Sequence, residues 1–157
     1  MPLPISPRGM YFEEFAAGQT VITPGRTVTE ADVMQFAGVS GDWNQMHVDA
    51  EFARGTLFGE RVAHGLLGLS MASGLAMQRG FMEGTVEAFM GLDWKFTAPV
   101  KFGDTISAEF EVTQKKAAGA AGIVILAVQV VNQRGEVVQK GKWTVLVKAR
   151  PAAQSGA

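Results

Sequence analysis

The chain has 157 residues, of which 47% are hydrophobic and 18% charged, enough apolar material for the core of one domain. Its 14 Lys and Arg nearly balance its 15 Asp and Glu, so the sequence indicates no basic surface and disfavours nucleic acid as a partner. The absence of cysteine excludes disulfides, thiolate metal sites and a cysteine nucleophile, and the two histidines, His47 and His64, are too few for a three-histidine metal site.

Targeting and membrane signals are not expected. Residues 1–10 are rich in proline and contain no long apolar run, so they resemble neither a signal peptide nor a transit peptide. The longest uncharged stretch, 62–78, falls short of a membrane span and contains several Gly and Ser residues. We therefore expect a cytoplasmic protein with no membrane contact. One domain is expected over 11–150, between an N-terminal extension, 1–10, and a disordered tail, 151–157.

The first part of this domain predicts one strand followed by short helices. Residues 19–28 are strand-like with a Pro-Gly bend. Thr29 begins a helix with a capping-box pattern, and the helix should end by Gly41. The segment 40–48 is expected to be a loop, after which Asp49 should cap a short helix that ends near residue 54.

The second part predicts one long helix and then a sheet. A helix from Gly65 to about Arg79 is apolar on nearly all sides, which is typical of a buried helix. The pattern then changes to period two, and four apolar residues alternate with polar ones: Ile106, Ala108, Phe110 and Val112. Further strands are predicted at 123–131 and 136–148. These patterns indicate an α+β fold in which a curved antiparallel sheet wraps one long buried helix.

The residues with the most chemical information lie in the loop after the first helix. Asp42 and His47 are both loop residues, five positions apart. Such a pair can converge on one water molecule, because histidine titrates near neutral pH and aspartate can orient it or share the proton. Spacing by itself nevertheless favours the plainer interpretation of a turn aspartate and a structural histidine. His47 and Asp49 could also contact a metal, but no third ligand is evident.

Three segments together carry a family resemblance: Gly41-Asp42-x-Asn44-x-x-His47 with Asp49 and Phe52-Ala53; Val62-Ala63-His64-Gly65 with Ser73-Gly74; and Phe96-x-x-Pro99-Val100-x-x-Gly103-Asp104. They resemble the active-site signature, central helix and following strand of the MaoC-like (R)-specific enoyl-CoA hydratases, which are hotdog-fold proteins. The resemblance extends over about residues 11–148. One position departs from the pattern, because Gln45 stands where the family usually has a proline that would stiffen the loop.

The resemblance implies the reversible hydration of trans-2-enoyl-CoA to (R)-3-hydroxyacyl-CoA. Asp42 and His47 would hold and activate the water and return a proton. The backbone N–H of Gly65, at a helix N-terminus, would bind the thioester oxygen. Asn44 and Ser73 would play supporting roles, and His64 would be structural. No cofactor and no metal are implied, since CoA arrives with the substrate, and a homodimer or higher homo-oligomer is expected.

The sequence is also compatible with two other functions. Hotdog folds also serve acyl-CoA thioesterases, although these do not generally carry the loop signature seen here. A non-catalytic acyl-thioester binding module is the third possibility, and Gln45 is the one feature that favours it. The sequence leaves open the acyl chain length, the choice between CoA and acyl carrier protein, and the physiological direction.

Overall fold

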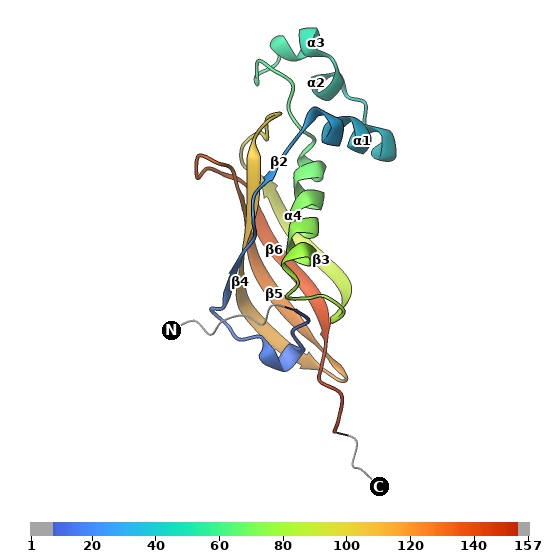
Figure 1. Ribbon diagram of the computed structural model, residues 1–157, viewed down its shortest axis with the longest axis vertical. Helices are drawn as coiled ribbons and strands as arrows, with labels where there is room; N and C mark the ends of the chain where they lie inside the picture. Colours follow the sequence, from blue (N-terminus) through green and yellow to red (C-terminus); the bar gives the residue numbers. More distant parts are fainter. Residues whose placement is uncertain (1–7, 154–157) are drawn as a thin grey trace.

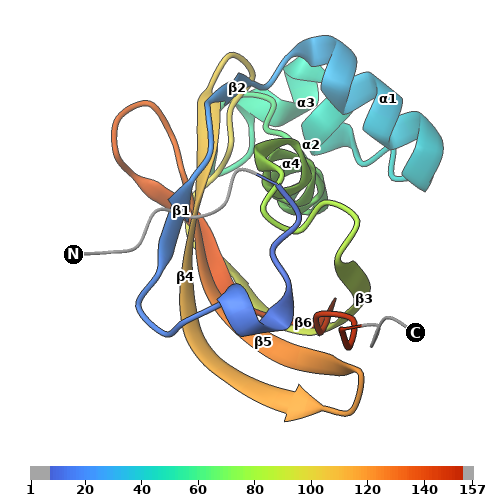
Figure 2. The same cartoon turned by 60° about the horizontal axis from the view of Figure 1, so that its bottom comes forward.

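The fold is built from one long helix that lies against the concave face of a curved antiparallel sheet, as the computed structural model shows for residues 8–153 (Figures 1 and 2). The helix is α4 (Gly65–Arg79). The sheet has the strand order β1 (Thr20–Ile22), β4 (Thr105–Ala118), β5 (Ala121–Val131), β6 (Val137–Lys148) and β3 (Val86–Phe96), and β2 (Arg26–Thr27) pairs separately with β4. The predicted α+β arrangement of helix and wrapped sheet is confirmed. The expectations for 1–7 and 154–157 lie outside the described residues.

The alternation in the sequence sets which face of each strand meets the helix. In β4 the four apolar residues named above are buried, and their polar neighbours point outward. Trp143 in β6 is fully buried and packs edge to face on Phe110 of β4, with ring centroids 5.2 Å apart. Register shifts interrupt the pairing in β3 and β4, and such bulges increase the local twist that curves the sheet.

Helix α4 packs one face into the core and leaves another uncovered. Six of its residues are buried: Leu67, Gly68, Met71, Ala72, Leu75 and Ala76. Gly68 leaves room for the Gln139 side chain, because a Cβ there would lie 2.3 Å from the side-chain nitrogen of Gln139. On the uncovered side Leu66 and Met77 are exposed. The helix that the sequence predicted to be apolar on nearly all sides therefore uses only part of its surface within one chain.

Three short helices gather beside the N-terminal end of α4, at the top of Figure 1: α1 (Glu30–Ser40), α2 (Gln45–Val48) and α3 (Ala50–Arg54). Thr29 caps α1 by accepting from the N–H of Asp32, and Gly41 ends the helix with a φ of 76°. Asp49 caps α3 as predicted. The segment 40–48 was predicted to be a loop, but it contains α2. The prediction missed this helix because four residues are too few to produce a helical period in the sequence.

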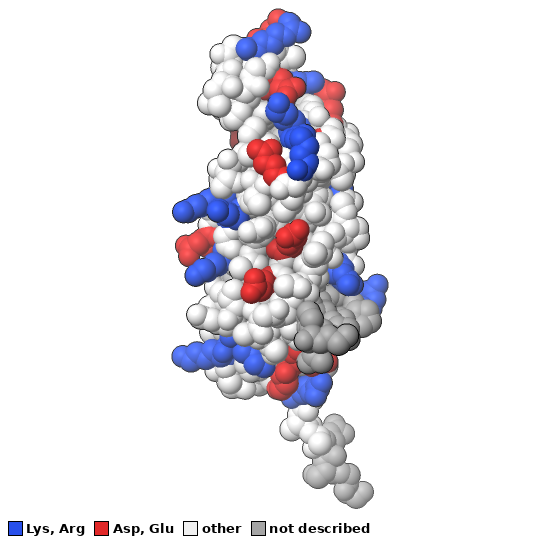
Figure 3. All heavy atoms as spheres, turned by 90° about the vertical axis from the view of Figure 1, so that its left-hand side faces the viewer, with Lys and Arg blue, Asp and Glu red and all other residues white. Residues whose placement is uncertain are grey.

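The first described residues of the chain are hydrogen-bonded to the segment that follows α4. Gly9 and Met10 donate main-chain hydrogen bonds to Gly80 and Phe81, which follow α4, and a 3-10 turn, η1 (Phe12–Glu14), comes next. Within residues 8–153 no helix has the length and hydropathy to cross a membrane. On the face seen in Figure 3, side chains of both charges are interspersed, so no field of one sign covers it.

Candidate active site

The loop between α1 and α2 is shaped by its own short polar side chains. The main-chain N–H of Asn44 donates to Asp42 Oδ1 at 3.2 Å, and Asn44 Oδ1 accepts from the N–H of Met46 at 3.1 Å. Asn44 is thereby the N-cap of α2, the helix that carries His47. The signature residues Asp42 and Asn44 thus fold the segment that points His47 inward, which is a physical reason for their spacing.

Gln45 occupies the first position of α2, where proline is especially well tolerated because its missing N–H would have no partner within the helix. The cap made by Asn44 is in place without a proline. The hydrogen bonds of Asp42 and Asn44 therefore hold the loop, and Gln45 removes only the restriction that a proline ring places on φ.

His47 is buried and has a defined tautomer. Its Nδ1 lies 2.7 Å from the main-chain oxygen of Val62, and a carbonyl oxygen can only accept, so Nδ1 carries the proton. In the neutral ring the lone pair is then on Nε2. The side chain is fixed by this bond to the segment just before α4, which brings together two parts of the chain 15 residues apart.

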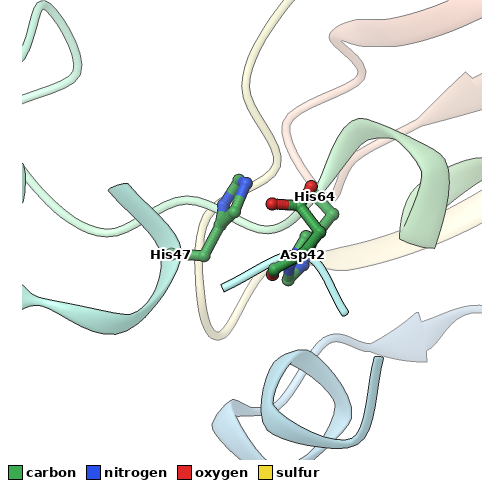
Figure 4. Close-up of side chains that lie close together, drawn as sticks. All are labelled: Asp42, His47 and His64. Atoms are coloured by element: carbon green, nitrogen blue, oxygen red, sulfur yellow. The ribbon is translucent and has the colours of Figure 1, made fainter. Parts of the chain in front are cut away.

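The structure brings Asp42, His47 and His64 together, as Figure 4 shows. One carboxylate oxygen of Asp42 and one ring nitrogen from each histidine all lie within 4.8 Å of one another. Asp42 is exposed, whereas both histidines are buried. The predicted pair of carboxylate and imidazole is therefore close in space, with a second imidazole beside it.

Burial lowers the pKa of His47 below its ordinary value near 6.5, because the charged ring would lose its solvation. The bond to Val62 and the negative charge of Asp42 act in the opposite direction, and the neighbouring His64 adds to the lowering. Desolvation is the largest of these effects. The neutral ring, with a free Nε2, is thus the form that the site favours at neutral pH, and this is the form that a general base requires.

The same three side chains offer the ligand types of a metal site, but their arrangement is poorly suited to one. The rings of His47 and His64 are stacked, with centroids 3.8 Å apart and planes 29° apart. Imidazole binds a metal along its in-plane lone pair, and stacked rings direct such lone pairs side by side rather than to a common point. The geometry fits proton transfer better than tetrahedral coordination.

A cavity of about 560 Å³ adjoins His47 and reaches the N-terminal end of α4. Its wall includes Gly65, the predicted backbone donor, together with apolar side chains from the connection before α4 and from the end of β3. Gly65 is the first residue of α4, so its N–H has no partner within the helix and is available to a ligand. Asp42 is exposed and is not among the residues that line this cavity.

Gln139 is a cavity residue that the sequence reasoning missed. Its side chain is 1% exposed, donates to the main-chain oxygen of Gly65 at 3.0 Å and accepts from the indole of Trp94 at 3.0 Å. It therefore ties the first turn of α4 to β3 and β6. A signal was available, because alternation from Trp143 places Gln139 on the inward face of β6, where a polar residue needs a partner.

Ser73 is not brought to the Asp42 and His47 pair within this chain. It lies eight residues beyond Gly65, which corresponds to about 12 Å along a helix axis. It borders a separate hollow of about 240 Å³ between α4, β3 and β6, whose wall includes Phe89 and Trp143. The predicted site residues thus fall in two places, four of them around the α4 N-terminus and Ser73 farther along the helix.

Comparisons with known proteins agree with this architecture. The monoamine oxidase regulatory protein from Archaeoglobus fulgidus has a solved structure that matches with a TM-score of 0.86 at 38% identity, covering 92% of this chain and 97% of that one. A Mycobacterium tuberculosis protein described as having a double hotdog fold shares the fold at 19% identity, with a TM-score of 0.80 over 95% of this chain and 47% of that one. The helix wrapped by a sheet is thus a hotdog fold.

Sequence relatives narrow the class further. A family model described as "MaoC like domain" matches residues 13–133. The (R)-specific enoyl-CoA hydratase of Rhodospirillum rubrum is 35% identical over 144 residues, which are 89% of this chain and 93% of that protein. Protein MaoC of Klebsiella aerogenes is 42% identical over 112 residues, 71% of this chain, and the match covers only 33% of that longer protein. The chain belongs to the MaoC-like dehydratase family.

Proposed function

We propose that this protein catalyses the reversible hydration of a trans-2-enoyl-CoA to the (R)-3-hydroxyacyl-CoA. The observation that carries the proposal is the buried His47, which is held by Val62 with its Nε2 free and lies beside the Asp42 carboxylate. A relative that this chain covers almost completely is named for this activity. Family membership supports a hydro-lyase in general, and the geometry of the pair supports the particular chemistry.

The proposed reaction balances with water and side chains alone. Asp42 and His47 hold the water, its oxygen forms a bond to C3, and the pair accepts its proton. The electrons of the C2–C3 double bond move toward the thioester, and the N–H of Gly65 at the positive end of α4 stabilises the oxygen as it gains enolate character. A proton returned from the pair to C2 completes the addition, so no cofactor is required by this scheme.

A single assay distinguishes hydration from the other functions considered. With crotonyl-CoA we expect loss of the enoyl absorbance without release of free thiol, and a product that an (R)-specific 3-hydroxyacyl-CoA dehydrogenase oxidises. Thiol release would indicate a thioesterase, and no change with retained binding would indicate a binding module. A product oxidised by the (S)-specific dehydrogenase alone would contradict the assigned stereochemistry.

We also propose that the functional unit is a homodimer formed along β3. This strand is at an edge of the sheet, and an edge leaves main-chain donors and acceptors unpaired. An apolar surface borders it, made of exposed side chains on β3 and α4: Phe89, Leu92, Phe96, Leu66 and Met77. A second copy related by a two-fold axis would cover this surface and pair the edges.

Replacing Leu92 with Lys should therefore weaken the dimer, because the new charge would have to be desolvated at the interface. Sedimentation should give about twice the chain mass of 16.7 kDa for the unmodified protein, and a lighter species for Leu92→Lys. Asp93→Lys is the control, since Asp93 is exposed on the opposite face of the same strand. A monomer at micromolar concentration before any substitution would disprove the proposal.

A further inference from the structure

His64 is a buried histidine that the proposed reaction does not use. It is 2% exposed and precedes α4 as its N-cap residue, although its side chain makes no capping bond. Instead the ring contacts three other segments. Its Nε2 lies 2.8 Å from the main-chain oxygen of Asp42, its face stacks on His47 at 3.8 Å, and Phe36 of α1 packs edge to face against it at 4.9 Å.

These contacts define the hydrogen bonding of the ring. The oxygen of Asp42 can only accept, so Nε2 carries a proton and donates it. Nδ1 is buried and has no hydrogen-bond partner among residues 8–153. The ring is therefore suited to holding its neighbours rather than to transferring protons.

We propose that His64 is a positioning residue that fixes Asp42 and His47 relative to one another, through its bond to the Asp42 main chain and its stacked ring. The two contacts have different structural roles. The Nε2–H anchors the loop from which the Asp42 carboxylate projects, and the stacked ring covers one face of the His47 imidazole. The effect on turnover rests on the proposed function, whereas the geometric role does not.

Covering one face of His47 has an electrostatic consequence. Desolvation is the largest cause of the lowered pKa of His47, and the stacked ring is part of what excludes water. The charges that act on His47 come from Asp42, which raises its pKa, and from His64, which lowers it. Removing the ring should thus raise the pKa of His47 toward its ordinary value.

Because the chain has only two histidines, NMR of the imidazole rings tests this without crowding. In the unmodified protein, long-range proton–nitrogen spectra should show one Nδ1–H ring, His47, and one Nε2–H ring, His64. Each His64 variant leaves a single ring signal, so the titration of His47 can be followed directly. This readout needs no substrate and remains decisive if the hydratase proposal fails on crotonyl-CoA.

Two matched variants separate the two contacts. His64→Phe keeps an aromatic ring against His47 but cannot donate to Asp42, whereas His64→Gln keeps an amide donor but removes the ring. We expect the titration of His47 to stay low in His64→Phe and to rise in His64→Gln. We expect kcat for crotonyl-CoA to fall at least about tenfold in His64→Phe, since loss of a buried hydrogen bond misplaces the loop.

Three results would contradict the positioning role of His64 or one of its two contacts. An Nδ1–H tautomer for His64 in the unmodified protein would overturn it, even if neither variant folds. An unchanged titration of His47 in folded His64→Gln would overturn the role of the ring. Full activity of folded His64→Phe, in a protein shown to hydrate crotonyl-CoA, would overturn the role of the bond to Asp42.

Discussion

His47→Gln is expected to lower kcat for crotonyl-CoA by at least about a hundredfold, within the range of about 10²–10⁴ that a general base contributes. Glutamine retains hydrogen-bonding capacity but has no group that titrates near neutral pH. Asp42→Asn should have a loss of similar order, because the amide oxygen can still accept from Asn44 while the negative charge is gone. Circular dichroism should show that both variants are folded.

The double variant and two controls make the test specific. Groups that act as a unit are not additive, so Asp42→Asn with His47→Gln should be little worse than the worse single variant. Glu51→Gln removes an exposed carboxylate on nearby α3 and should leave kcat unchanged. Ser73→Ala should cost less than either change to the pair, since Ser73 borders a separate hollow. Near-normal kcat in folded His47→Gln would refute the proposed role of the pair.

The same pair predicts the direction of the pH dependence. The active form of His47 is the neutral ring, and its pKa is lowered chiefly by burial. The rate should therefore be retained as the pH falls through the ordinary histidine range near 6.5, and be lost only below it. This loss of rate at low pH should be absent from the residual activity of His47→Gln, because that variant lacks the titrating ring.

Much of the fold follows from periodicity and caps. The alternation around Phe110 predicts an inward face of β4, and Thr29, Asp49 and Gly65 mark helix starts that the structure contains. The helix α2 was missed because one turn of Gln45–Val48 gives no period to detect. Local patterns therefore identify long elements and their ends, and fail where an element is too short to repeat its pattern.

In the candidate site, too, the sequence predicted local contacts and missed contacts between distant segments. The loop signature placed Asp42, Asn44 and His47 together because the two hydrogen bonds that shape the loop, from Asn44 to Asp42 and from Met46 to Asn44, are local. The stack of His64 on His47 joins residues 17 positions apart, and it depends on how α4 docks beside the short helices. No sequence pattern reports that docking. The contacts of Gln139 with α4 are likewise tertiary, although its inward place on β6 is a local signal.

Ala72→Asp should prevent the protein from folding. Ala72 has no exposed surface and lies in the apolar core on the side of α4 that faces the sheet. A carboxylate there would have no partner, and burying it unpaired costs several kcal/mol, against a total stability of about 5–15 kcal/mol for a domain. Ser70→Asp, on an exposed position of the same helix, is the matched control and should remain soluble. Soluble yield and urea denaturation followed by circular dichroism would compare the two. Equal yields and equal denaturation midpoints would mean that this side of α4 does not face the core.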